Sequence, residues 1–294
     1  MEDLDNWRKA GKIAAEALAY GKQLIKPGSS LLEVTEKVEK KIFELGGVPA
    51  FPVQISCDDI AAHYCAYFDD KIILKEQLVN LDVGVAVEGC IGDTACSVDL
   101  SGKNQKLIEA AESALSAAIE AVKQGKTLGE IGKAIQKAIE SFGFSPVRNL
   151  SGHGLDINDI HTYPSIPNYD NGDETILKDV IIAIEPFATN GEGMIYESGN
   201  ANIFSLKQKK PVRNPMTRNI LKEIESYEGR PFCTRWLDKK FHKGYISLAI
   251  KEMRNLDMLN EFPPLPDQKH GLVSQAEHSL YIDEDGKVEI LTKI

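Results

Sequence analysis

Cysteine is scarce in this chain of 294 residues, and no two cysteines stand in a Cys-x-x-Cys spacing. The five that occur are odd in number and lie at positions 57, 65, 90, 96 and 233. Such a set fits neither a disulfide framework nor a cysteine-based zinc site, and it favours a reducing compartment.

Long apolar runs are missing as well. No stretch approaches the ~20 apolar residues that a membrane helix needs. The chain starts Met-Glu-Asp-Leu-Asp, which is acidic and has no apolar signal core. We therefore expect a cytoplasmic protein without a membrane partner. Hydrophobic residues still make up 43% of the chain, which excludes wholesale disorder and allows a large core.

Positive charge is in deficit, with 34 Lys and Arg against 44 Asp and Glu and a net charge of −10. This argues against a general nucleic-acid binder and against a specific DNA partner. The charge is uneven, because residues 207–254 hold 13 basic and 5 acidic residues, which leaves 21 basic and 39 acidic residues elsewhere. The basic segment is either a solvated helical face or a surface that docks near ribosomal RNA.

The chain contains an internal repeat. Residues 28–49 align with residues 125–146 at an offset of 97, and residues 74–82 align with residues 177–185 at an offset of 103. In each first block, a hydroxyl residue with a glutamate three positions later predicts a capped helix start, and a glycine predicts the helix end. We infer a duplicated α/β unit with pseudo-two-fold symmetry.

The second unit is interrupted by an insertion. The counterpart of Asp93 would fall at residue 196, but the next acid in a strand-like segment is Glu277. The insertion is predicted to be mainly helical, with helical patterns over residues 214–230 and 244–259. The predicted domain limits are 1–200 and 265–294 for the catalytic domain and 201–264 for the insertion.

Two acids are predicted to lie on one face of a hairpin. Residues 79–87 alternate as a strand with one apolar face, and Asp82 points to the other face. Glu88-Gly89 can turn the chain into a return strand over residues 90–98. Asp93 would then lie diagonally from Asp82, ~7–8 Å away, which suits two carboxylates that share cations. The alternative is a pair of solvent-facing acids.

Three further residues complete a metal-ligand pattern. Glu185 ends the apolar run VIIAI, where an unpaired carboxylate would be costly, and Glu277 lies in the strand-like segment SQAEHSLYI. His153 lies between two glycines in a predicted loop, where a structural role is the alternative. Four carboxylates and one imidazole favour Mn, Fe or Co over structural zinc. They can balance two divalent ions, which points to metal-assisted hydrolysis.

The order Asp82, Asp93, His153, Glu185 and Glu277 on a duplicated scaffold resembles the pita-bread metallopeptidases. Local sequences narrow the resemblance to type II methionine aminopeptidases: PAFPVQIS (49–56), AAHY (61–64), LDVGV (81–85), GDTA (92–95), NLSGH (149–153), AIEPFAT (183–189), PPL (263–265) and SQAEH (274–278). The long gap between the two glutamates is typical of type II, and the lack of a charged N-terminal extension resembles the archaeal form. The resemblance covers nearly the whole chain and implies an α/β pita-bread fold, a curved antiparallel sheet flanked by helices.

The resemblance also implies an activity, the removal of the initiator methionine from nascent polypeptides. Two divalent metal ions (Co, Mn, Fe, Ni or Zn) would bind the five ligands, with Asp93 and Glu277 bridging them, and a hydroxide would attack the first peptide bond. Glu185 would also move protons. The protein is expected to be a monomer.

The family further implies roles for residues around the metals. His161 would hydrogen-bond the carbonyl as it becomes an oxyanion, and His63 would contact the scissile amide. The pocket for the methionine side chain would consist of Phe51, His63, Ile160, His161, Phe187 and Phe262. Cys65, two residues after His63, would be either a reactive thiol or a small residue of the pocket wall.

Other functions remain open at this stage. A related Xaa-Pro peptidase of the same fold usually carries an additional N-terminal domain, for which this chain has no room. A non-catalytic binding protein of this fold would have lost ligands, and all five positions are filled here. A carrier metalloprotein would not need His63 and His161 at equivalent positions of the repeat.

Overall fold

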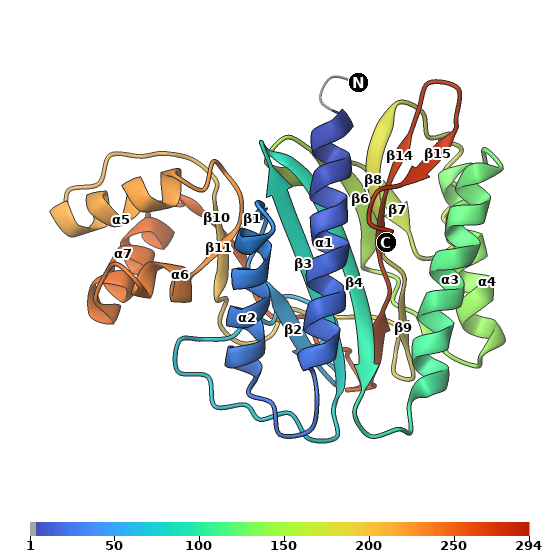
Figure 1. The fold of residues 1–294 in the computed structure, drawn as a ribbon, viewed down its shortest axis with the longest axis horizontal. Helices are drawn as coiled ribbons and strands as arrows, with labels where there is room; N and C mark the ends of the chain where they lie inside the picture. The colour runs from blue at the N-terminus through green and yellow to red at the C-terminus, as the bar shows by residue number, and fades with distance from the viewer. Residues whose placement is uncertain (1–3, 294) are drawn as a thin grey trace.

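The structure, a computed structural model, describes residues 4–293, so the first residues of the predicted acidic start lie outside the described residues. The first repeat consists of two helices followed by four strands: α1 (Leu4–Leu24), α2 (Leu31–Glu44), β1 (Val48–Pro49), β2 (Gln54–Cys57), β3 (Leu78–Val87) and β4 (Cys90–Asp99). Figure 1 shows α1 in front of β3 and β4, with α2 beside α1. Their apolar stripes bury against the odd-numbered face of β3, as the alternation predicts.

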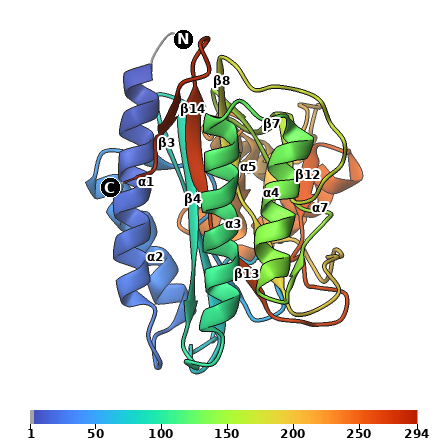
Figure 2. The ribbon, with the colours of Figure 1, turned by 90° about the vertical axis from the view of Figure 1, so that its right-hand side faces the viewer.

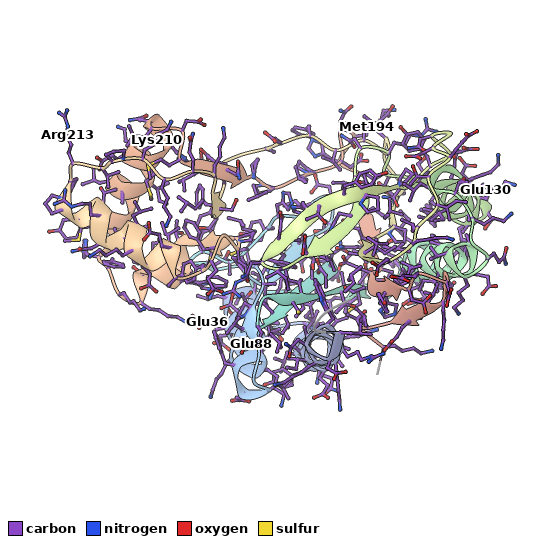
Figure 3. The ribbon with its side chains drawn as sticks, turned by 90° about the horizontal axis from the view of Figure 1, so that it is seen from above. Glu36, Glu88, Glu130, Met194, Lys210 and Arg213 are labelled. Carbon is purple, nitrogen blue, oxygen red and sulfur yellow. The ribbon has the colours of Figure 1, made fainter. Side chains whose placement is uncertain are left out.

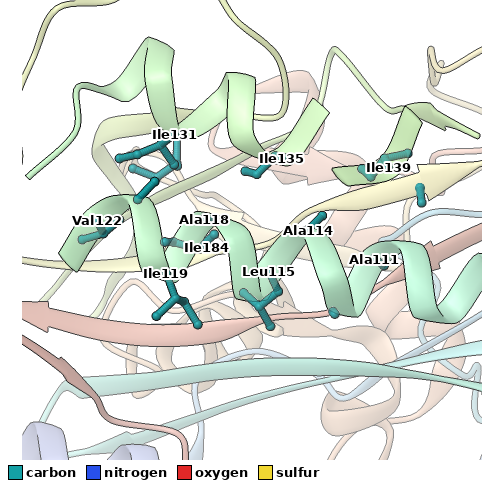
Figure 4. Close-up of a cluster of buried hydrophobic side chains, with 14 of the residues drawn as sticks. Ala111, Ala114, Leu115, Ala118, Ile119, Val122, Ile131, Ile135, Ile139 and Ile184 are labelled. Atoms are coloured by element: carbon teal, nitrogen blue, oxygen red, sulfur yellow. The ribbon is translucent and has the colours of Figure 1, made fainter. Parts of the chain in front are cut away.

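The second repeat also begins with two helices, but more strands follow them. Its helices are α3 (Gln105–Lys123) and α4 (Leu128–Ser141), and its strands are β5 (Ser145–Pro146), β6 (Ser151–Asp156), β7 (Asp159–Pro167), β8 (Val180–Ile184), β9 (Phe187–Thr189), β13 (Val273–Gln275), β14 (His278–Ile282) and β15 (Val288–Ile290). In Figure 2, α3 and α4 lie side by side in front of the strands. Figure 4 shows the apolar side chains that join the two helices to Ile184 of β8.

The strand register confirms the duplication and the slip between its two offsets. Val48 of β1 pairs with Ala86 of β3, and Ser145 of β5 pairs with Thr189 of β9. Val48 and Ser145 are 97 positions apart, and Ala86 and Thr189 are 103 positions apart. These are the two offsets of the sequence repeat. The predicted helix ends are also confirmed. Gly46 and Gly143, each with positive φ, directly follow the C-caps of α2 and α4.

The β3–β4 hairpin has the predicted register. Glu88 and Gly89 form a two-residue turn with φ of +49° and +82°, which matches the twist of the two strands. Asp82 therefore faces Ala95, and Asp93 faces Gly84. The two acids lie diagonally across the hairpin, as predicted.

Two of the predicted ligands, Glu277 and His153, have a different backbone setting from the one expected. Glu277 is not inside a strand, because it lies in the break between β13 and β14, just as Glu185 lies in the break between β8 and β9. His153 is not in a loop but in strand β6. The flanking glycines allow this strand to approach its neighbours closely, since a Cβ on Gly152 would lie 2.3 Å from the Ala183 carbonyl oxygen.

The insertion forms a second lobe beside the strands (Figure 1). It contains three helices and a small antiparallel sheet in the order β11-β10-β12: β10 (Ile203–Leu206), α5 (Pro215–Glu225), β11 (Phe232–Cys233), α6 (Thr234–Asp238), α7 (Lys243–Asn255) and β12 (Leu259–Phe262). Its helices bury their own apolar cluster around Phe232 and Met253. The two predicted helices extend too far, because residues 226–230 turn and residue 259 starts β12. The domain limits 201 and 264 remain a prediction. The separate apolar cluster of the insertion is consistent with them.

No helix within residues 4–293 is long and apolar enough to cross a membrane.

Candidate metal centre

One cavity of about 320 Å³ contains all eleven residues predicted for metal and substrate binding. The strands of both repeats supply it: β3 and β4 carry two ligands, β6 carries the third, and the two strand breaks carry the glutamates. The other residues of its wall are Gln54, Ala62, Asn149, Leu150, Ser151, Ile203 and Pro231. The duplication thus places equivalent elements of the two halves around one site.

Three of the other four predicted ligands have atoms within a few ångströms of His153, and the fourth, Asp82, lines the same cavity. The His153 Nε2 atom is 3.5 Å from Glu185 Oε1 and 4.0 Å from Asp93 Oδ2. One donor atom from each of Asp93, His153 and Glu277 falls within 4.8 Å of the others, which is the spacing of a metal-ligand group. All three of these side chains are buried.

The cavity raises the pKa of every carboxyl in this group. Burial is the main cause at all four, and the neighbouring carboxylates add repulsion for Asp93, Glu185 and Glu277. Burial raises the pKa of Asp82 to about 7, although a hydrogen bond from Gln275 opposes the rise. Four acids that repel one another in a buried place need cations to become charged together.

The three histidines of the cavity are held neutral. Burial, together with the smaller effect of the His161 ring, lowers the pKa of His153 to about 3 and that of His63 to about 4. Loss of hydration among the surrounding atoms also lowers the pKa of His161, although this side chain is open to solvent at the cavity. A neutral imidazole can bind a metal through one nitrogen or donate one N–H to a substrate.

These residues fit divalent metal ions. Among the described residues, no lysine or arginine lines the cavity, so no side chain compensates the four carboxylates. The Oδ1 atoms of Asp82 and Asp93 are buried and have no hydrogen-bond partner. Oxygen-rich ligation with a single imidazole suits Mn, Fe or Co, as the sequence predicted.

Two glutamines of the site were not predicted. Gln275 Nε2 lies 3.4 Å from Glu185 Oε2 and 3.5 Å from Glu277 Oε2, so it can orient both glutamates. Gln54 accepts the backbone N–H of His63 at 2.6 Å. The sequence signal for Gln275 was its place in SQAEH, a polar residue two positions before a predicted ligand in a buried strand.

Apolar side chains form the part of the wall that would hold the first side chain of the substrate. Phe51, Ile160 and Phe187 are each at most 5% exposed. Gly84 leaves the space that the Phe51 ring occupies, because a Cβ on it would lie 2.2 Å from that ring. A thioether side chain packs well against aromatic edges, so the wall suits methionine.

The insertion closes another side of the cavity. Ile203, Pro231 and Phe262 reach it from β10, from the segment before β11, and from β12. The Phe262 ring lies 5.6 Å from the His63 ring and 6.3 Å from the His161 ring. The insertion therefore contributes side chains to the site.

Cys65 lies behind the wall and does not line the cavity. Its side chain is 1% exposed and packs with Cys233 and Ile203. A hydrogen bond with Cys233 and burial raise the pKa of the Cys65 thiol well above its usual value. A neutral buried thiol is a weak nucleophile, which disfavours the reactive role. The predicted place in the pocket wall is also wrong, because Cys65 packs behind Ile203 of that wall.

Comparison with known proteins agrees with this geometry. The sequence matches metallopeptidase family M24 over residues 5–212, and the chain belongs to that family. It is 44% identical to the methionine aminopeptidase of Archaeoglobus fulgidus over 97% of each chain. It is 42% identical to that of Methanocaldococcus jannaschii over 100% of this chain and 99% of the relative.

A solved structure of a methionine aminopeptidase, from Rickettsia prowazekii, has a TM-score of 0.71 and 25% identity. The alignment covers 99% of this chain and 97% of that chain. The predicted membership of the pita-bread metallopeptidases is thereby confirmed. Both of the sequence relatives named above are archaeal, as the resemblance implied.

Proposed function

We propose that this protein removes the N-terminal methionine from nascent polypeptides by metal-assisted hydrolysis of the first peptide bond. The observation that supports this most directly is the cavity itself, in which four acids and one histidine, each buried or half-buried, border an aromatic wall. The alignment of nearly the whole chain with methionine aminopeptidases supports the same activity.

The five ligands would hold two divalent ions, which supply an activated water and a Lewis acid for the carbonyl. The ligands of the two ions would be Asp82, Asp93, Glu277, His153 and Glu185. Gln275 would keep the two glutamates oriented through its amide group. Glu185 borders the cavity and would also accept and return the proton of the attacking water.

The remaining polar side chains would act on the substrate. His161 is neutral and open to the cavity, so it can donate a ring N–H to the carbonyl oxygen as that atom gains charge. His63 would contact the scissile amide from the opposite repeat. Phe51, Ile160, Phe187 and Phe262 would surround the methionine side chain.

The rival functions are not favoured. An Xaa-Pro peptidase and a non-catalytic binding protein share this fold, but the two sequence relatives named above, which align along nearly the whole chain at more than 40% identity, are methionine aminopeptidases. All five ligand positions also meet in one cavity, which a protein that had lost catalysis would not need.

The test is the release of methionine from a Met-Ala-Ser peptide with added Mn or Co, together with the metal content per chain. We expect release that depends on the metal and stops when a chelator removes it. Without release under any divalent metal, or without metal uptake, the proposed function is wrong.

The basic segment 207–254 would contact ribosomal RNA where nascent chains emerge. Six of its 13 basic residues form ion pairs with described acids and are less available. Lys210 and Arg213, outside these pairs, lie at the end of the insertion far from α3 and α4 (Figure 3). With Lys251 they line an open groove of about 850 Å³.

Such a contact should weaken as salt rises, because basic side chains release counterions when they bind phosphates. Co-sedimentation with ribosomes over a salt series measures this, and Arg213→Ala with Lys251→Ala should reduce it. Binding that is absent, or that salt leaves unchanged, would refute the contact. We further propose that the protein acts in the cytoplasm and that it is a monomer. Sedimentation of the purified chain would test its oligomeric state, and fractionation of cells would test its location.

A further inference from the structure

A buried ion pair joins the insertion to the first repeat. The two guanidinium nitrogens of Arg235 in α6 lie 2.8 Å and 2.6 Å from the two carboxylate oxygens of Glu39 in α2. Trp236 Nε1 donates to the same carboxylate at 3.1 Å. Arg235 is 2% exposed and Glu39 is 4% exposed. A buried pair of this kind costs desolvation, so it holds a fixed geometry more than it adds stability.

The same junction holds the chain that follows His63. Arg235 Nε donates to the Ala66 carbonyl at 3.3 Å. The amide of Asn202, 3% exposed, donates to the carbonyls of Cys65 and Ala66 at 3.2 Å and 3.4 Å. Asn202 is oriented in turn, because its Oδ1 atom accepts the hydroxyl of Thr234. Two residues of the insertion therefore hold two consecutive carbonyls of this segment.

His63 needs such support because its own backbone is strained. It has φ of +66°, in the left-handed region that non-glycine residues rarely adopt, and it lies outside any helix or strand. On its N-terminal side, Gln54 of β2 accepts the His63 N–H. On its C-terminal side, the insertion provides the contacts to Cys65 and Ala66. The imidazole is held between these two anchors and packs on Phe262.

We propose that Asn202 and Arg235 are positioning residues for His63, so that the insertion sets the orientation of this imidazole in the cavity. The inference rests on the proposed function, because it assumes that His63 acts on the substrate. Neither residue lines the cavity, so both act through the segment that they hold. A shift of about 1 Å in a group that acts on the reacting bond can cost ~100-fold in rate.

The test is a double-mutant cycle on methionine release from Met-Ala-Ser. Asn202→Ala and, separately, Arg235→Lys should lower kcat/KM by about 10- to 100-fold, mainly through kcat, with unchanged metal content. In a His63→Ala background, the same changes should lower kcat/KM by less than about two-fold, the usual error of additivity. Arg254→Lys is the matched control, because Arg254 forms a bidentate but exposed pair with Glu261 inside the same insertion.

Each outcome decides the proposal. Equal losses with and without His63 would mean that Asn202 and Arg235 act independently of it, which overturns the inference while the proposed function stands. The inference is also overturned if both variants fail to fold, since the contacts would then hold the whole fold rather than one side chain. Absence of methionine release by the unmodified enzyme would instead refute the proposed function itself.

Discussion

The Nε2 atom of His153 lies 3.5 Å from Oε1 of Glu185, and the two residues come from neighbouring parts of the second repeat. His153 projects from strand β6, and Glu185 occupies the break that separates β8 from β9. The break turns the glutamate toward the histidine, so that an imidazole nitrogen and a carboxylate oxygen can face one cation. This pair is the most direct target for testing the site.

Replacement of Glu185 by glutamine should reduce methionine release by at least ~100-fold, because the amide cannot move a proton and binds a cation more weakly. Release from Met-Ala-Ser, with metal content measured in parallel, checks this. Glu289→Gln is the control, since Glu289 pairs with Arg8 at the surface. Turnover close to that of the unmodified enzyme would show that Glu185 handles no proton.

Replacement of His161 by alanine should cost ~100-fold or more in kcat, the scale for the loss of one oxyanion donor. The metal content should stay the same, because His161 is not among the predicted ligands. His270→Ala provides a comparison, since His270 is exposed and bonds Asp59 away from the cavity. If the two variants behave alike, His161 does not stabilise the transition state.

Gly84→Ala should impair binding of the methionine side chain. The added Cβ would lie 2.2 Å from the Phe51 ring, so the ring must move into the space that the substrate needs. We expect KM for Met-Ala-Ser to rise by about ten-fold or more, the discrimination that a misfit of one methylene group can produce. Gly244→Ala in α7 is the control, because its nearest contact is an ordinary 3.4 Å. An unchanged KM would place the methionine elsewhere.

Metal affinity should fall as the pH falls below about 7. Burial raises the pKa of Asp82 to about 7 in the metal-free chain, and the other three carboxyls are shifted in the same direction. A cation must displace these protons, so each proton displaced weakens binding by about ten-fold per pH unit below its pKa. Calorimetry in buffers of different ionisation enthalpy counts the protons, and Asp82→Asn should release one fewer. Affinity independent of pH would contradict the raised pKa values.

Sequence alone predicted the features that depend on local patterns. The alternation of residues 79–87 and the Glu88-Gly89 turn were sufficient to place Asp82 and Asp93 diagonally. The repeat predicted a duplicated unit, and the equivalent pairings in the two halves confirm it. These features depend on neighbours in the chain or on an aligned copy, so one sequence contains the necessary information.

Features that depend on distant contacts were missed. The strand break at Glu277 is visible only once β13 and β14 pair with β9 and β8 across the insertion. Strands β10 and β12 likewise pair across some fifty residues, so the insertion looked more helical than it is. The role of Gln275 depends on the carboxylates of Glu185 and Glu277, which lie next to it only in the folded chain.

The two halves of the metal centre form at very different distances along the chain. Asp82 and Asp93 are joined by one short hairpin, whereas Glu185 and Glu277 meet only when strands on either side of the insertion have paired. Contacts between residues far apart in sequence form late, since their loop-closure cost comes first. A folding intermediate with only the hairpin would thus present two carboxylates and hold a divalent ion weakly. Tight metal binding would then require the last stage of folding. Catalytic activity would likewise require the pairing of the strands on either side of the insertion.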